Sequence, residues 1–140
     1  MQQILSTRYT LQAPDDWLDQ STVTLLGPPR PGFFPNVTIN QEPPPEGMQL
    51  DGYFAQQRRE LMTLEGFRLE AHGDRLLGGT KALWHRYSWI TPQRFGITQL
   101  QLMGYHGGIA YTLTASATSE DFPSFEPAFE QLIAGFRFTA

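Results

Sequence analysis

The sequence contains no cysteine, which excludes disulfide bonds and thiolate chemistry of any kind. It also lacks an apolar run approaching the roughly 20 residues that span a bilayer. Its N-terminal segment, residues 1–17, has neither the basic and long apolar stretches nor the small-residue cleavage site of a signal peptide. These absences predict a soluble cytoplasmic protein.

Charge is scarce as well: Asp, Glu, Lys and Arg make up 17% of the 140 residues, with a net charge of −4. Proteins that bind nucleic acid or anionic membranes carry basic clusters that neutralise phosphates. The composition therefore argues against both as the main partner. A hydrophobic content of 40% is typical of a folded chain, and the length predicts one domain, residues 1–140.

Motifs of catalysis and metal binding are also missing. The histidines, His72, His85 and His106, form no HxH or HExxH pair with metal-ligand spacing. "HGG" (His106–Gly108) has no G-x-S-x-G elbow beside it and is predicted to be a tight turn. "LLGGTK" (Leu76–Lys81) lacks the complete phosphate-loop pattern. We predict a protein that is not an enzyme and that uses no metal or cofactor.

Short β-rich runs and two helical patterns make up most of the chain. Strands are predicted at Tyr9–Pro14, Ser21–Leu26, Asn36–Gln41, Phe67–Asp74 and Lys81–Ile90, and a hairpin at Gly96–Thr118. One helix is predicted from an Asp51 N-cap to a Gly66 stop, and a final helix from a Ser124 cap. The proline-rich segments between strands are predicted to be loops. This order predicts an α+β fold, an antiparallel β-sheet with helices packed on one face.

Side chains alternate along a strand, so each predicted strand contributes residues to two faces. One set is mainly aliphatic and is predicted to form the core with the last helix: Val23, Leu25, Val37, Ile39, Leu100, Leu102, Tyr111, Leu113, Phe125, Phe129, Leu132 and Ile133. The opposite set is polar but uncharged, and we call it the polar face: Thr22, Thr24, Asn36, Thr38, Asn40, Gln99, Gln101, Thr112, Thr114 and Ser116, with Phe95 and Ile97 at one end.

The polar face avoids charge, which is unusual for a surface in permanent contact with water. No Lys, Arg, Asp or Glu occurs from Phe95 to Ser119, whereas solvated strands usually carry Lys and Glu. An unpaired charge is costly to desolvate, and a hydrogen-bonded hydroxyl or amide costs far less. Two interpretations stay open: a face that an apolar partner covers, or an ordinary exposed Thr-rich sheet, since Thr has high β-propensity.

Five short segments carry a resemblance to a known family. They are "PDDWLDQS" (Pro14–Ser21), "INQE" (Ile39–Glu42), "LEGF" (Leu64–Phe67), "TQLQL" (Thr98–Leu102) and "DFPSFEPAF" (Asp121–Phe129). In this order and spacing they resemble the DcrB-related family and, within it, the Eag chaperones that accompany type VI secretion effectors. The resemblance extends over nearly the whole chain.

The resemblance implies a PsbP-like fold, a homodimer, and a cytosolic chaperone without catalytic activity. Such chaperones hold the hydrophobic N-terminal transmembrane segments of a PAAR or Rhs effector, the client, until it is loaded for export. They bind it on the concave sheet face with the help of one helix. The polar face and the positions carried over from the family together give these client-binding residues: Thr22, Thr24, Asn36, Thr38, Asn40, Leu61, Leu64, Phe95, Ile97, Gln99, Gln101, Thr112 and Thr114.

The sequence departs from the family pattern in its threonines. Thr22, Thr38 and Thr112 stand at positions suited to Ile or Val. The departure indicates a weaker hydrophobic grip, or a client with more small and polar residues.

Two other functions remain open from the sequence. One is an adaptor that binds a folded protein partner through the same fold. The other is a small-ligand binder with an aromatic pocket built from Trp84, Tyr87 and Trp89.

Overall fold

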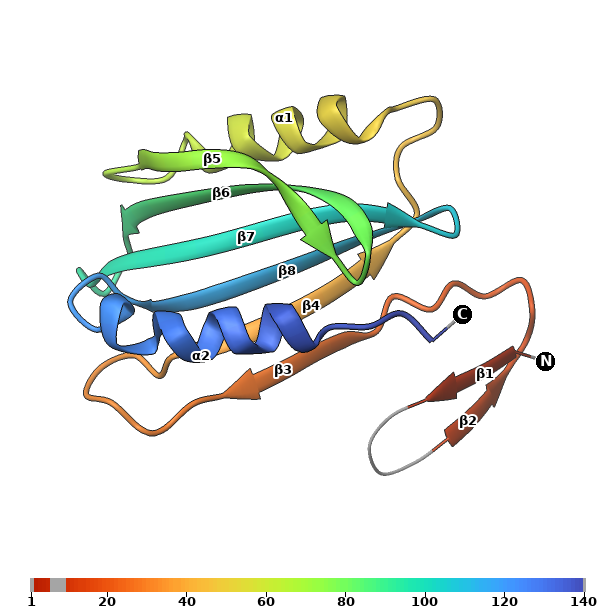
Figure 1. Ribbon diagram of the computed structural model, residues 1–140, viewed down its shortest axis with the longest axis horizontal. Coiled ribbons are helices and arrows are strands. Elements are labelled where there is room, and N and C mark those ends of the chain that lie inside the picture. The colour runs from red at the N-terminus through yellow and green to blue at the C-terminus, as the bar shows by residue number, and fades with distance from the viewer. Residues whose placement is uncertain (1, 6–9, 140) are drawn as a thin grey trace.

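The computed structural model describes residues 2–5 and 10–139 (Figure 1). Its elements are β1 (Gln2–Leu5), β2 (Thr10–Ala13), β3 (Thr22–Leu26), β4 (Asn36–Glu42), α1 (Leu50–Leu61), β5 (Arg68–Leu77), β6 (Thr80–Ile90), β7 (Gly96–His106), β8 (Ile109–Thr118) and α2 (Phe122–Gly135). The sequence did not predict β1. Tyr9, predicted to begin a strand, lies outside the described residues.

Six strands form one antiparallel sheet in the order β3-β4-β8-β7-β6-β5, and β1 pairs with β2 in a separate hairpin. Tight turns at Gly78–Gly79 and Gly107–Gly108 join β5 to β6 and β7 to β8. Both glycines of each turn have positive φ, which a two-residue hairpin loop of type I′ requires. The predicted tight turn in "HGG" is therefore confirmed, as is the α+β class with an antiparallel sheet.

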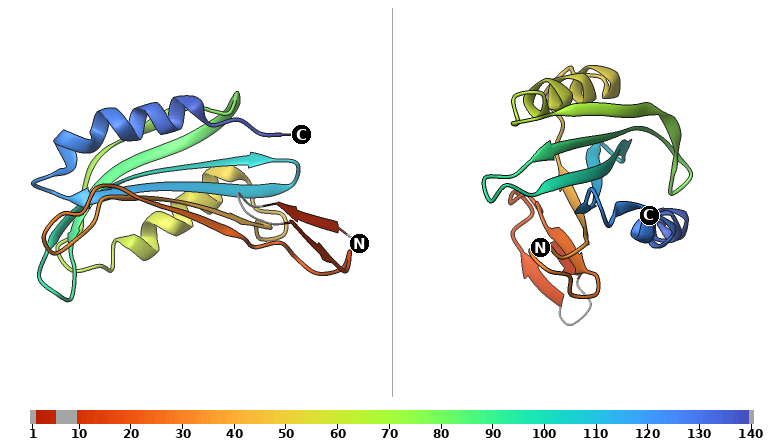
Figure 2. Two further views of the ribbon diagram at one scale, coloured as in Figure 1. Left: turned by 90° about the horizontal axis from the view of Figure 1, so that it is seen from below. Right: turned by 90° about the vertical axis from the view of Figure 1, so that its left-hand side faces the viewer.

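The two helices lie on opposite faces of the sheet (Figure 2). α2 packs against the core that contains Leu102 on β7, whereas Tyr53 and Phe54 of α1 pack against Met103 and Ala110. Leu102 and Met103 are consecutive in a strand and so point to opposite faces. The prediction that both helices pack on one face was wrong in this respect: α1 covers part of the side that carries the polar face.

The predicted register of the central hairpin is confirmed, because Leu100 and Leu102 are 4% and 0% exposed beneath α2. Of the other predicted core residues, Val37, Leu113, Phe129 and Ile133 are buried and Ile39, Tyr111 and Phe125 are half-buried. The prediction was wrong for three, Val23, Leu25 and Leu132, which are 51%, 46% and 42% exposed. β3 is an edge strand, so none of the described strands pairs beyond it, and a pocket separates its Leu25 side chain from α2.

The predicted helix ends were displaced by a few residues. α1 begins at Leu50, so Asp51 lies in its first turn, where a negative charge still suits the helix dipole, but it is not the cap. Gly66 lies in the turn after the helix, not directly at its end. α2 begins before Pro123, whose fixed φ suits a first helical turn, and this leaves Ser124 inside the helix.

Candidate functional site

The polar face is one continuous surface across the four neighbouring strands β3, β4, β8 and β7. In one row the register places Thr24 opposite Thr38, Thr38 opposite Thr114 and Thr114 opposite Gln101. The next row joins Thr22, Asn40 and Thr112, and a third joins Asn36, Ser116 and Gln99. The structure therefore brings together all the strand residues that alternation assigned to this face.

α1 covers only one side of this face. The Phe54 ring lies 4.3 Å from the His85 ring, centroid to centroid, so the helix sits over β6 and its neighbours. On β3 and β4, Thr22, Thr24 and Asn40 are exposed. Figure 2 shows α1 near β5 at one side of the sheet and β3 and β4 toward the other side, with no helix over them on this face. The polar face thus has α1 as a wall at one side. Its side chains on β3, β4, β8 and β7 form an open floor.

The first hydrogen-bond chain in the floor runs through Gln99. The Trp89 Nε1–H donates to Oε1 of Gln99 at 2.8 Å, and Nε2 of Gln99 donates to the Ser116 hydroxyl at 2.8 Å. The three residues stand on β6, β7 and β8. One amide thus connects three strands and leaves both its carbonyl and its amino group partnered.

The second chain is parallel to the first and begins on α1. Arg58 Nε–H donates to Nδ1 of His85 at 3.1 Å, the opposite ring nitrogen lies 2.8 Å from Oε1 of Gln101, and Nε2 of Gln101 donates to the Thr114 hydroxyl at 3.1 Å. Because Nδ1 accepts a bond, the proton of the neutral ring is on Nε2 and is donated to Gln101. His85 is 0% exposed. Burial, with smaller contributions from the Arg58 and His72 charges, lowers the pKa of His85 to about 4.

Among β3, β4, β8 and β7, this side of the sheet carries one carboxylate, at the margin. Glu42 follows Asn36, Thr38 and Asn40 in the alternation of β4 and accepts a hydrogen bond from the Tyr53 hydroxyl of α1. Burial and this bond raise the pKa of Tyr53 to about 12. The Glu42 carboxylate is therefore engaged by α1, and the rest of the floor between β3 and β7 carries no charged side chain.

The four apolar residues predicted for client binding gather at one end of the sheet. α1 ends at Leu61, and backbone bonds from Ile90 to Glu65 and from Thr91 to Phe95 bring the α1–β5 turn and the β6–β7 turn to that end. Leu61, Leu64 and Phe95 are half-buried, whereas Ile97 is 2% exposed and is part of the packing. The proline-rich β3–β4 loop also reaches Phe95, because a Cβ at Gly32 would lie 2.6 Å from the ring.

Sequence reasoning missed three members of the two hydrogen-bond chains: Arg58, His85 and Trp89. The alternation of β6 contained the signal for two of them, since His85, Tyr87 and Trp89 share one face. The same alternation places Trp84 on the α2 side, packed against that core. Trp84, Tyr87 and Trp89 therefore do not enclose a common pocket, and the predicted aromatic ligand site is wrong.

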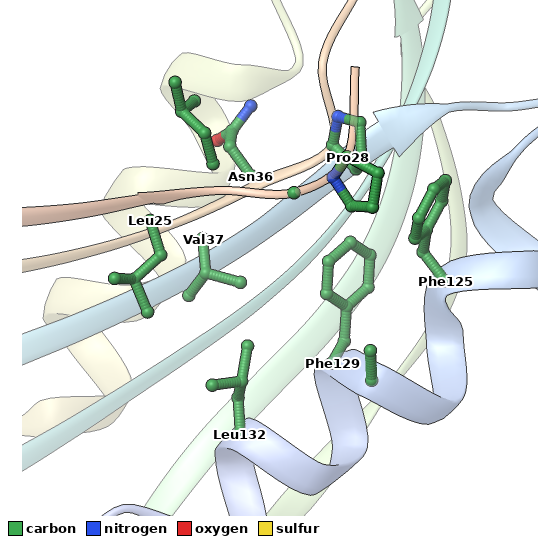
Figure 3. A pocket seen from close by; sticks show the side chains of 11 residues that line it. Leu25, Pro28, Asn36, Val37, Phe125, Phe129 and Leu132 are labelled. Atoms are coloured by element: carbon green, nitrogen blue, oxygen red, sulfur yellow. The ribbon is translucent and has the colours of Figure 1, made fainter. Parts of the chain in front are cut away.

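A second apolar surface lies on the α2 side of the sheet edge. A pocket of about 120 Å³ opens between β3, the following proline-rich loop and α2 (Figure 3). Leu25 and Val37 point into it from the strands, and Phe125, Phe129 and Leu132 point into it from the helix. This pocket is separate from the polar face because the sheet lies between them.

The charged residues near α2 tie it to other elements. Asp121, at the N-cap, is paired with Arg30 of the proline-rich loop at 3.0 Å, and the bond with Arg30 lowers the pKa of Asp121. Glu130 pairs with Arg75 of β5 at 2.8 Å.

In the described part of the chain no group of three or more His, Asp or Glu is placed to hold a metal ion. None of the helices in residues 2–5 and 10–139 is both long and apolar enough to cross a membrane.

Three solved structures share the fold. PA94 of Pseudomonas aeruginosa, a protein of unknown function, superposes with a TM-score of 0.86 at 22% identity, covering 100% of this chain and 98% of that one. LpqN of Mycobacterium tuberculosis, involved in cell envelope biogenesis, gives 0.61 at 14% identity, covering 86% of each chain. The PsbP of Synechocystis sp. PCC 6803 gives 0.57 at 12% identity, covering 97% of this chain and 91% of that one. At these identities the likeness shows the fold, which is PsbP-like as predicted.

Sequence comparison gives the family. No curated protein is significantly similar in sequence to this chain. The family model of DcrB matches residues 9–135, which is most of the chain. The protein therefore belongs to the DcrB family.

Proposed function

We propose that this protein is a non-enzymatic cytoplasmic chaperone that binds and shields the hydrophobic N-terminal transmembrane segments of a type VI secretion effector of the PAAR/Rhs type. The class of client comes from the resemblance to Eag chaperones. The physical support comes from the polar face, whose chemistry suits an apolar helix. A cytoplasmic location and the lack of catalysis are parts of the same proposal.

The observation that carries the proposal is the pairing of polar groups within the floor. Gln99 and Gln101 each have their carbonyl and their amino group engaged by neighbouring side chains. A polar group that keeps its partner costs little to remove from water, whereas an unpaired one costs several kcal/mol. An apolar helix can therefore cover this face without stranding the amides, which a surface of Lys and Glu would not allow.

The same groups can also give a membrane helix specific contacts. Each amide NH₂ has two hydrogens and uses one in the chains described above, so one remains for a client oxygen. Membrane helices pack through Gly, Ala, Ser and Thr and bond through polar side chains. Covering the rest of such a helix removes apolar area from water at about 25 cal/mol per Å². Leu61, Leu64 and Phe95, at one end of the face, are placed to contribute to that part.

A homodimer belongs to the proposal, and the edge strand β3 is its best-supported contact. Val23, Leu25 and Leu26 are exposed on β3, and no charge, proline or bulge blocks this free edge within Thr22–Leu26. The opposite edge, β5, carries charged side chains and a bulge after Leu69, which are common protections against edge pairing. Exposed apolar patches of this kind mark protein contacts.

Co-expression tests the function directly. The chain is produced with the N-terminal apolar segment of a PAAR/Rhs effector from the same genome, and with the same effector lacking that segment. We expect the chain to co-purify with the segment and not with the truncated effector. Co-purification with the truncated effector would instead favour an adaptor for a folded partner. Failure of the segment to co-purify or to become soluble would overturn the proposal.

A further inference from the structure

We infer that His85 is a positioning residue for the client site, holding α1 as the wall of the polar face while its ring is neutral and releasing it when the ring gains a proton. The inference rests on the proposed function for the identity of the site. The claim that His85 controls the position of α1 depends only on contacts within the free protein.

His85 joins the wall to the floor through four contacts. From α1, the Phe54 ring packs on the imidazole, and Arg58 donates to Nδ1. From β7, the Gln101 carbonyl accepts a hydrogen bond from Nε2, and the Gln101 amino group donates one to the Thr114 hydroxyl. From β6, the Tyr87 ring meets the imidazole edge-on at 5.0 Å between centroids. Besides its apolar contacts and the Tyr53–Glu42 hydrogen bond, α1 thus meets the sheet at a ring that is both acceptor and donor.

Protonation changes only one of the two polar contacts. A protonated ring still donates from Nε2 to Gln101, but its Nδ1 becomes a donor facing the Arg58 Nε–H at 3.1 Å. A hydrogen bond is then replaced by two facing donors and two like charges. The charged groups that face His85 are Arg58 on α1 and His72, its cross-strand neighbour on β5, and both repel the protonated form. No carboxylate is among the groups that act on the ring.

The ring responds to pH below neutrality. Burial, with repulsion by Arg58 and His72, lowers the pKa of His85 to about 4. The His85 ring therefore stays neutral throughout the neutral pH range, and in this form it holds α1 against the sheet. Acid favours a state in which Arg58, and with it α1, has left the ring. The geometry predicts the direction of this response: acid weakens the contact between α1 and the sheet and does not strengthen it.

Two variants separate the titration of the ring from its bonds. His85→Gln keeps a carbonyl that can accept from Arg58 and an amide that can donate to Gln101, but it cannot be protonated. His85→Phe keeps the aromatic volume against Phe54 and loses both hydrogen bonds. His72→Gln is the matched control, since it removes a neighbouring exposed histidine and leaves the contacts of His85 in place.

The test uses the whole chain and two readouts. The first is amide hydrogen exchange of α1, corrected for the intrinsic rate and referred to α2, from pH 7 to pH 4. The second is affinity for a fluorescent, Lys-flanked peptide of about 20 Leu, Ala, Gly and Ser residues, the length of a membrane span. In the wild type and in His72→Gln we expect protection of α1 and affinity to fall together, each by about tenfold, as the pH falls. In His85→Gln both stay flat, and in His85→Phe α1 is already less protected at pH 7.

Each outcome has one meaning. An unchanged acid response in His85→Gln, or an Nδ1–H tautomer in the histidine ¹⁵N spectrum at pH 7, would overturn the inference. If the peptide affinity depended neither on pH nor on the His85 substitutions, His85 would have no role in client binding, and the proposed function would be unaffected. An α1 response as expected, with no peptide bound at any pH, would confirm the role of His85 in the fold and count against the proposed function.

Discussion

Gln99 on β7 donates a hydrogen bond of 2.8 Å from Nε2 to the hydroxyl of Ser116 on β8, on a face of the sheet that no helix covers completely. Ser116 is only 3% exposed, and the carbonyl of the same amide accepts from Trp89. An amide that engages one buried and one half-buried partner contributes to stability although it lies on a polar surface.

Replacing Gln99 by Leu is therefore expected to destabilise the protein. The substitution leaves the Ser116 hydroxyl and the Trp89 N–H without their partner, which costs about 1–3 kcal/mol. Urea unfolding followed by tryptophan fluorescence measures the change. The control is Gln131→Leu on the exposed surface of α2, expected to change stability by no more than about 0.5 kcal/mol. Equal effects of the two substitutions would show that the Gln99 bonds contribute nothing.

The core beneath α2 gives a second prediction. Leu102 has no exposed surface, and truncation of a fully buried leucine to alanine costs about 2–5 kcal/mol. Leu132 lies on α2 but is 42% exposed, so Leu132→Ala is expected to cost much less. Thermal unfolding of the two variants should separate them clearly. A larger loss for Leu132→Ala would mean that α2 packs on the sheet through a different face.

The stability of the protein is expected to fall in acid through His85. Its pKa is lowered from 6.5 to about 4 in the folded state, so the unfolded chain binds the proton more readily. The stabilisation is complete above pH 6.5 and is lost as the pH falls through 4. One pKa unit corresponds to about 1.4 kcal/mol, so the loss between these values is about 3–4 kcal/mol at most.

Urea unfolding at pH 7 and at pH 4.5 measures this loss. His85→Gln should remove most of the difference between the two pH values, because the amide does not titrate. If this variant lost stability in acid as steeply as the wild type, other groups would be responsible.

The edge strand β3 gives a prediction about assembly. Leu25→Lys places a charge among the exposed apolar residues of this edge, and desolvating that charge would oppose any contact there. We expect a dimer for the wild type and a monomer for the variant in light scattering at micromolar concentration. Leu76→Lys, which replaces another exposed leucine on the far edge strand β5, is the control and should remain dimeric. A monomeric wild type would contradict the proposed homodimer.

The sequence was most informative where strands alternate without interruption. The hairpin of β7 and β8 has Leu100 and Leu102 on one side and Gln99 and Gln101 on the other, and the structure agrees because a register error would have buried the amides. The polar face could therefore be predicted residue by residue.

What the sequence could not give was the placement of the helices. An amphipathic pattern says which side of α1 is buried, but not which face of the sheet it meets, because both faces have apolar residues near β7. The role of His85 was hidden for the same reason, since its partner Arg58 reaches it only from that helix. Val23 and Leu25 followed a core pattern, but no strand-to-strand pattern shows which strand will lie at the edge.

The most direct test of the proposed chaperone function places a charge on the open floor of the polar face. Thr112 is half-buried between Asn40 and Met103 in the register, and the nearby carboxylate of Glu42 already accepts a hydrogen bond from Tyr53. Thr112→Lys should leave the melting temperature of the free protein nearly unchanged, because the side chain can reach water. Against a bound apolar helix the same charge must lose its water without a partner, at several kcal/mol.

The measurement is co-purification of the effector's N-terminal segment with Thr112→Lys, beside Gln131→Lys as the matched charge on the other side of the sheet. We predict that the first variant loses the segment and that the second keeps it, with both folded as judged by their melting temperatures. If Thr112→Lys retained the segment at the wild-type level, the client would bind elsewhere, and the polar face would be an ordinary threonine-rich sheet.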